Sequence, residues 1–67
     1  MQPHEERVVK ERDELDEKIG KLCDFIGSSK IYKSLPEPER SRLSVQLHYM
    51  QSYSHILHER VRSFPAS

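Results

Sequence analysis

The chain has 67 residues, with 11 basic side chains, 11 acidic side chains and one cysteine. A single cysteine excludes a disulfide framework within the chain, and the zero net charge gives no reason to expect direct DNA binding. No apolar run approaches the ~20 residues of a membrane-spanning helix, so no membrane association is expected. A domain near this size buries only about 60% of the surface that its unfolded chain exposes, and small domains commonly gain support from oligomerisation.

Charge is distributed unevenly along the chain. Residues 1–27 contain five basic and eight acidic side chains, whereas residues 28–67 contain six basic and three acidic ones. The two parts therefore have opposite net charge. Such halves are suited to lying side by side in one chain or to pairing between chains.

The first predicted element is a helix over residues 4–26. Its seam has alternating spacings of four and three residues, which is the pattern of a helix that packs along its length: Val8, Arg12, Leu15, Ile19, Leu22 and Ile26. Gly27 follows directly and is expected to end the helix in a left-handed cap. Cys23 is expected to be a packed, free thiol. Arg12 is expected either to extend toward solvent or to pair with Glu59 across the hairpin.

A short helical turn over residues 28–35, capped by Ser28 or Ser29, is expected to close the end of the hairpin. The second long helix is predicted over residues 36–64, with Pro38 among the first positions, where no amide hydrogen is needed. Its seam again has four-three spacing: Leu43, Leu47, Met50, Ser54, Leu57, Val61 and Phe64. Two seams and a short linker predict an all-α antiparallel hairpin, a single domain over residues 1–67. We expect it to assemble into a homo-oligomeric helical bundle.

The second helix has more apolar surface than one neighbouring helix can cover. At ~100° per residue, its apolar arc spans roughly 200°, whereas one packing partner requires about 100°. Val45, Tyr49, Tyr53 and Ile56 supply the excess. Another chain or a ligand is expected to cover it.

Polar residues extend the same face at four-three spacing, and together they form the candidate partner- or ligand-binding site: Arg42, Gln46, Tyr49, Tyr53, Ile56 and Arg60. The tyrosines and arginines favour an oligomer interface in which the arginines pair with the acidic first helix of a neighbour. Alternatively, the rings stack on a base and the guanidinium groups bind phosphate. The residue types permit both interpretations.

Nothing in the sequence indicates catalysis, since it contains no glycine-rich phosphate loop, no nucleophile paired with a base and no metal-ligand motif. We therefore expect no enzyme activity, no metal and no cofactor. His55 and His58 are one turn apart, but no third ligand is convincingly placed to complete a metal site. Solvated histidines are the expected outcome.

The sequence resembles a group of small bacteriophage proteins named by relation to a gene product of a crAss-like phage. The resemblance covers residues 7–64 and rests on Arg7-Val8-Val9, Glu11 to Lys18, Lys21-Leu22, Phe25-Ile26-Gly27, Leu35-Pro36, Glu39, Arg42-Leu43, Gln46, Met50, Tyr53, Ile56-Leu57, Arg60-Val61 and Phe64. In size and predicted architecture the chain is also similar to phage anti-defence proteins. Some of these are oligomeric sponges for cyclic nucleotide immune signals, and others are inhibitors that cover a protein surface.

The resemblance implies a phage-encoded, non-enzymatic binding protein that acts in the cytoplasm of the bacterial host. A host protein is the first expected target, and the binding is expected to counter host defence. Two alternatives remain open: an oligomeric sponge that sequesters a cyclic nucleotide, and a purely structural or assembly oligomer. The fold-level similarity does not choose between them.

Overall fold

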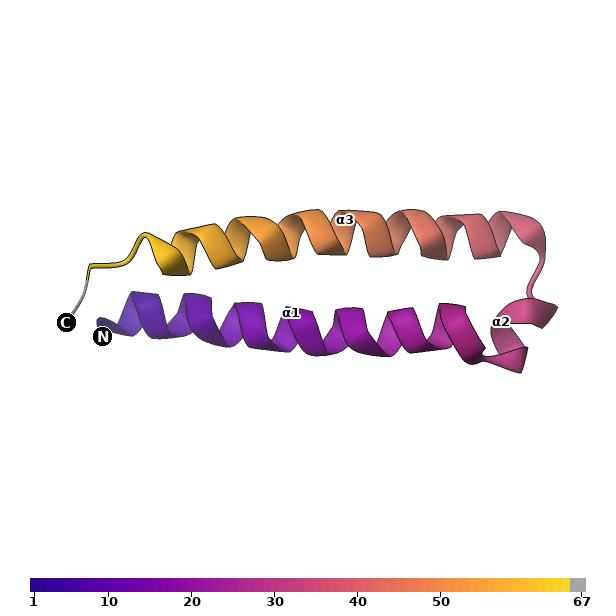
Figure 1. Ribbon diagram of the computed structural model, residues 1–67, viewed down its shortest axis with the longest axis horizontal. Coiled ribbons are helices and arrows are strands. Elements are labelled where there is room, and N and C mark those ends of the chain that lie inside the picture. The colour runs from indigo at the N-terminus through magenta and orange to yellow at the C-terminus, as the bar shows by residue number, and fades with distance from the viewer. Residues whose placement is uncertain (66–67) are drawn as a thin grey trace.

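The computed structural model describes residues 1–65 and consists of three helices (Figure 1). Helix α1 spans Pro3–Ser28, α2 spans Lys30–Ser34 and α3 spans Glu37–Arg62. Helices α1 and α3 lie antiparallel along a molecule of 49 × 15 × 14 Å. The predicted all-α hairpin is confirmed.

Helix α1 begins two residues into the chain. Pro3 occupies the first turn, where its missing amide hydrogen has no helical acceptor. The Glu5 carboxylate accepts a hydrogen bond from the Gln2 backbone N–H at 2.7 Å, and Glu5 and Glu6 lie in the first turn, where the helix dipole favours negative charge. The observed start is one residue earlier than predicted.

The predicted left-handed cap at Gly27 is wrong. Helix α1 continues through Ser28, and no residue among 1–65 has a positive φ. The Ser28 hydroxyl donates to the Asp24 carbonyl at 2.8 Å, and the extended Ser29 donates its backbone N–H to the Phe25 carbonyl at 3.1 Å. Because these bonds from Ser28 and Ser29 satisfy carbonyl groups of the last turn, α1 ends without a glycine in the left-handed conformation.

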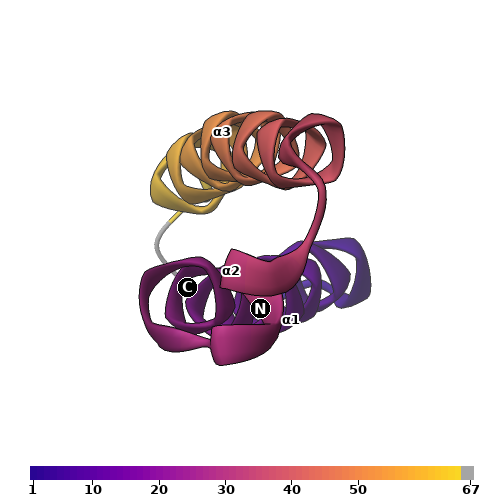
Figure 2. The same cartoon turned by 90° about the vertical axis from the view of Figure 1, so that its right-hand side faces the viewer.

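Ser29 also begins α2, as the predicted short turn requires. Its hydroxyl accepts hydrogen bonds from the backbone N–H groups of Ile31 at 3.1 Å and Tyr32 at 3.4 Å. In the end-on view, α2 lies against the end of α1 and the chain then crosses to α3 (Figure 2).

Tyr32 joins α2 to both long helices. Its ring packs edge-on against Phe25, with centroids 5.9 Å apart, and its hydroxyl lies 3.4 Å from both the Arg40 carbonyl and the Ser44 hydroxyl. The Arg40 guanidinium donates to the Leu35 carbonyl at 3.1 Å. The crossing between α2 and α3 is therefore held by specific bonds.

Helix α3 begins after Pro36, with Pro38 in its first turn as predicted. It ends at Arg62, two residues before the predicted Phe64. There the Ser63 hydroxyl donates to the Arg60 carbonyl at 2.7 Å. This bond competes with continuation of the helix.

The apolar core lies between α1 and α3. Val8, Leu15 and Leu57 are buried, and Leu57 has no exposed surface. Partly buried apolar residues surround them: Ile19, Met50, Val61 and Phe64. The two predicted seams therefore do face each other.

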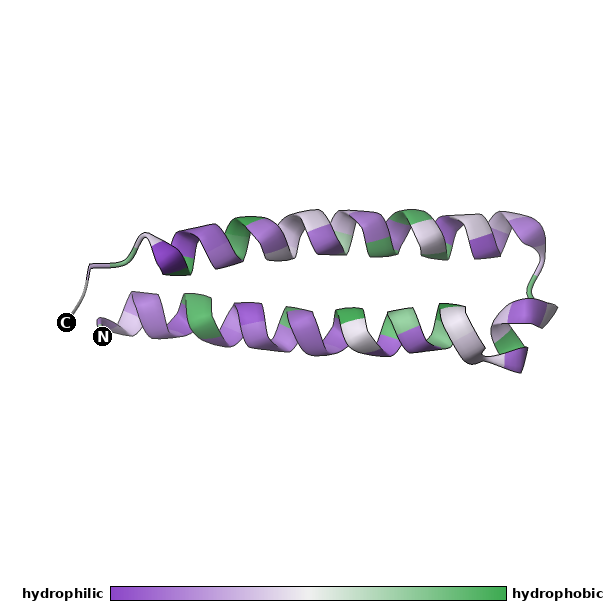
Figure 3. Ribbon diagram, viewed as in Figure 1, coloured by the Kyte–Doolittle hydropathy of each residue, from purple (hydrophilic) through white to green (hydrophobic). Residues whose placement is uncertain are grey.

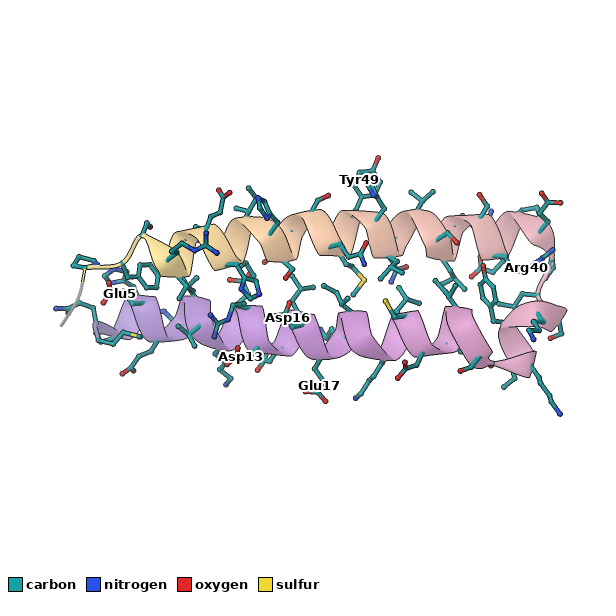
Figure 4. The ribbon with its side chains drawn as sticks, viewed as in Figure 1. Glu5, Asp13, Asp16, Glu17, Arg40 and Tyr49 are labelled. Atoms are coloured by element: carbon teal, nitrogen blue, oxygen red, sulfur yellow. The ribbon has the colours of Figure 1, made fainter. Side chains whose placement is uncertain are left out.

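A polar cluster at the edge of the same seam links the long helices. The Asp16 carboxylate accepts a hydrogen bond from the Ser54 hydroxyl at 2.5 Å and lies 2.8 Å from Nε2 of His58. The hydroxyl of Ser54, followed by the imidazole of His58, lowers the pKa of Asp16 below its ordinary value. Figure 4 shows Asp16 directed toward α3, whereas Glu17 points away from it.

Two side chains on α1 differ from expectation. Arg12 binds Asp13 of its own helix, with Nε and Nη2 at 3.1 and 3.0 Å from Oδ1, whereas Glu59 lies 2.9 Å from His55. The proposed Arg12–Glu59 pair is therefore absent, because each group has a partner on its own helix. Cys23 is exposed, so the expectation of a packed thiol was wrong.

Candidate binding face on helix α3

The residues predicted to bind a partner or ligand all lie on α3, on the part of its surface that α1 leaves uncovered. We call this surface the outer face, and it consists of Arg42, Val45, Gln46, Tyr49, Tyr53, Ile56 and Arg60. Each of these residues is exposed. Tyr49 points directly away from α1 in Figure 4.

The apolar part of the outer face is large for so small a chain. Tyr49 is 68% exposed, Ile56 52%, Val45 50% and Tyr53 46%. Figure 3 shows hydrophobic segments on the outer edge of α3 as well as on the edge that faces α1. The excess apolar surface inferred from the sequence is therefore not covered within the folded chain.

The outer face carries positive charge at both ends. Arg42 is bound to Glu39, one turn earlier, with Nε and Oε1 2.9 Å apart, yet its side chain is 70% exposed. Arg60 is exposed and forms no ion pair with any other residue in the described part of the chain. Both guanidinium groups can therefore reach a molecule in solution.

Local contacts steady the middle of the outer face. The Tyr49 ring packs edge-on against His48, with centroids 5.8 Å apart. The Gln46 amide lies 3.7 Å from the Met50 sulfur, which belongs to the seam. These contacts restrict side chains that would otherwise lose more conformational entropy on binding.

The structure does not gather the six candidate residues into one pocket. Arg42 and Arg60 are separated by 18 positions, or about 27 Å along a helix with a rise of 1.5 Å per residue. A shallow depression beside the outer face is lined by His48, Gln51, Ser52, His55 and Ile56. Of these residues, sequence reasoning had assigned only Ile56 to the binding surface.

Sequence reasoning missed the bond between His58 and Asp16 and treated His58 as a solvated side chain. The positions of the two residues in the sequence could have predicted this bond. Asp16 follows the seam residue Leu15, and His58 follows the seam residue Leu57, so each flanks the contact between the helices. In an antiparallel hairpin, side chains that flank the seam on the same side approach each other.

A profile of the Sequestin family matches residues 2–63. The chain belongs to the Sequestin family. The family name indicates a sequestering function, which is a binding role and not a catalytic one. Neither a comparison with curated proteins nor one with solved structures gave a significant match.

The Sequestin match covers the whole hairpin from Gln2 to Ser63, including every residue of the outer face. Among residues 1–65, no helix is both long and apolar enough to cross a bilayer.

Proposed function

We propose that this Sequestin captures a small phosphorylated ligand, a cyclic nucleotide immune signal, on the outer face of α3. The phage origin and the counter-defence role in the host cytoplasm are taken from the resemblance over residues 7–64. Sequestration requires stoichiometric binding and no chemical step, which suits a chain with no catalytic motif. The observation that carries the proposal is the presence of two exposed tyrosines between two exposed arginines on one helical face.

The chemistry of these side chains matches the parts of a nucleotide. A tyrosine ring stacks on a base, and this stacking contributes about 1–3 kcal/mol per base. A guanidinium group binds phosphate through two parallel hydrogen bonds. Arg60 is suited to this role because its charge is not already neutralised by a neighbouring carboxylate.

A single hairpin cannot enclose such a ligand. Binding sites for small molecules are concave and typically bury 70–90% of the ligand surface. The outer face belongs to one helix of a molecule only about 15 Å thick, and its candidate residues form a convex stripe. The proposed site therefore requires a second surface, which an oligomer supplies.

A host protein remains the second candidate target. It is favoured by the length of the stripe, because about 27 Å of helix with apolar residues in the middle and arginines at the ends resembles a surface for another helix. A protein target would also need no concave pocket on a single hairpin.

Isothermal titration calorimetry with a panel of cyclic di- and trinucleotides tests the proposal. We expect at least one of them to bind, and Tyr53→Ala or Arg60→Ala to abolish its binding. Arg62→Ala is the matched control, because Arg62 is also an exposed arginine in the last turn of α3 but lies outside the stripe. If no nucleotide binds, the ligand proposal is wrong. Co-purification of one host protein that Tyr53→Ala alone prevents would then favour the second candidate.

A further inference from the structure

Six of the seven residues of the outer face, all except Val45, form a stripe with symmetric spacing. From Arg42 to Arg60 their spacings are four, three, four, three and four residues, so the stripe is symmetric about position 51. The residue types follow this symmetry at four of the six positions. Arginines occupy both ends and Tyr49 and Tyr53 are the central pair, whereas Gln46 and Ile56 correspond in position but not in residue type.

Such a stripe is complementary to a reversed copy of itself. In a two-fold symmetric dimer, residue i contacts residue j and residue j contacts residue i. If two α3 helices pack antiparallel with the axis beside position 51, each Tyr49 lies at the level of Tyr53 of the second copy. Val45 then lies close to the level of Ile56 of the second copy, so the four central apolar side chains, each 46–68% exposed in one chain, lose part of their exposure in the dimer, and the remaining ring surface of the tyrosines stays available to stack on a base.

The charged residues of the stripe also give this dimer an excess of positive charge at each end of the interface. The same pairing brings Arg42 to the level of Arg60 of the second copy, and this happens at both ends of the interface. Glu39, which is 2.9 Å from Arg42, supplies one carboxylate at each end. Glu59 lies on another side of α3 and is bound to His55. Each end therefore has two guanidinium groups and one carboxylate, which leaves one positive charge in excess.

We infer that the chain forms an antiparallel dimer through the outer face of α3, and that each end of the interface is an anion site shared by Arg42 of one copy and Arg60 of the other. The inference rests on the proposed function, because it takes a phosphate group of the sequestered ligand as the anion. The two sites lie about 27 Å apart, since 18 helical residues separate the arginines. One cyclic dinucleotide is too short to span them, so the dimer binds two ligands, one per chain.

A complementation experiment separates a shared site from a site within one chain. Arg42→Gln and Arg60→Gln each remove one guanidinium from both ends of their homodimer, so neither variant alone should bind. A mixed dimer has one end that lacks both arginines and one end that retains both. After subunit exchange at equal concentrations, we expect the mixture to recover about a quarter of the wild-type capacity, because about half of the dimers are mixed and each has one of two sites.

The probes are cyclic di-AMP and inorganic pyrophosphate, both titrated by calorimetry, and light scattering records the mass. Recovered binding of either probe by the mixture, at twice the 7.9 kDa chain mass, supports the inference. Binding that Arg42→Gln or Arg60→Gln alone retains, binding that the mixture fails to recover, or a wild-type monomer overturns it. A wild-type chain that binds neither probe also overturns it.

The proposed function and the inference fail separately in this experiment. If the mixture recovers binding of pyrophosphate but cyclic nucleotides never bind, the shared anion sites stand and the ligand proposal fails. If cyclic di-AMP binds to the wild type but the mixture shows no recovery, the ligand proposal stands and the shared site fails. A matched mixture of Arg62→Gln with wild type should bind at full capacity, because Arg62 lies outside the stripe.

Discussion

Helix α3 has two apolar faces that differ sharply in burial. On the inner face Leu57 is completely buried and Ser54 is 8% exposed, because both lie against α1. On the outer face Ile56, the immediate neighbour of Leu57, is 52% exposed. Leu57 and Ile56 are adjacent aliphatic residues of the same helix, so the difference between them is due to which side of α3 the first helix covers.

The comparison separates residues needed for folding from residues available for binding. Burial of apolar surface stabilises a fold by roughly 25 cal/mol per Å², and the inner face gains this on folding. The outer face gains this stabilisation only when a second chain or a ligand covers its apolar side chains. Exposed apolar surface of this kind commonly marks an interaction site in soluble proteins.

The largest expected effect is the loss of stability caused by truncating a buried residue on the inner face of α3. Leu57→Ala should lower the free energy of unfolding by about 3 kcal/mol, because it removes a fully buried side chain and leaves a cavity. The matched outer variant, Ile56→Ala, should change it by no more than about 0.5 kcal/mol in dilute protein. Urea denaturation followed by circular dichroism measures both. Equal losses would mean that the outer face also packs within one chain.

The next effect is on binding. Tyr53→Ala should weaken binding of the ligand or second copy by at least about tenfold, equivalent to ~1.4 kcal/mol, since central aromatic residues dominate many interfaces. Its helix content should remain that of the wild type. Gln51→Ala is the control, because Gln51 is exposed and lies two positions from Tyr53, about 200° around the helix. Calorimetry and circular dichroism of the same samples would reveal a variant that loses binding only by unfolding.

A smaller loss of stability is expected from a substitution in the polar cluster of Asp16, Ser54 and His58. Asp16→Asn should lower the free energy of unfolding by about 1 kcal/mol, because it weakens the bonds to Ser54 and His58 while the side chain remains partly exposed to water. Asp13→Asn breaks only an exposed pair with Arg12 and should have an effect nearer zero. Chemical denaturation at neutral pH distinguishes the two variants.

The same cluster predicts a modest pH dependence. Because the folded state lowers the pKa of Asp16, its contribution to stability is fully present above the ordinary aspartate pKa. It is lost as the pH falls through the lower pKa of the folded state. Thermal melts over the acidic range should therefore show a loss of stability that is smaller in Asp16→Asn. His58→Gln, which removes one of the groups that lower this pKa, should move the loss to higher pH.

The arrangement of the long helices was predictable from sequence because it depends on a repeating pattern. Seam residues such as Val8, Leu15 and Leu57 recur at helical spacing, and the short linker leaves an antiparallel hairpin as the simplest packing. The excess apolar surface of α3 followed from the same periodicity. Neither inference needed the exact rotation of any side chain.

Contacts between single side chains were less predictable. The Asp16 cluster depends on the rotation of α1 against α3, which spacing alone does not determine. Arg12 binds Asp13, since a neighbour on the same helix is already close, whereas Glu59 would have to be reached across the hairpin. The end of α1 was misplaced because a serine bonded to the Asp24 carbonyl substitutes for a glycine cap.

Light scattering over a range of protein concentrations gives the most direct test of whether a second copy covers the outer face of α3. The expected result is a mass of twice 7.9 kDa for the wild type, returning to 7.9 kDa in Tyr49→Glu with unchanged helix content. Tyr49 is the most exposed of the tyrosines, so a charge there should prevent pairing without disturbing the hairpin. A wild-type mass of 7.9 kDa at every concentration would contradict the account.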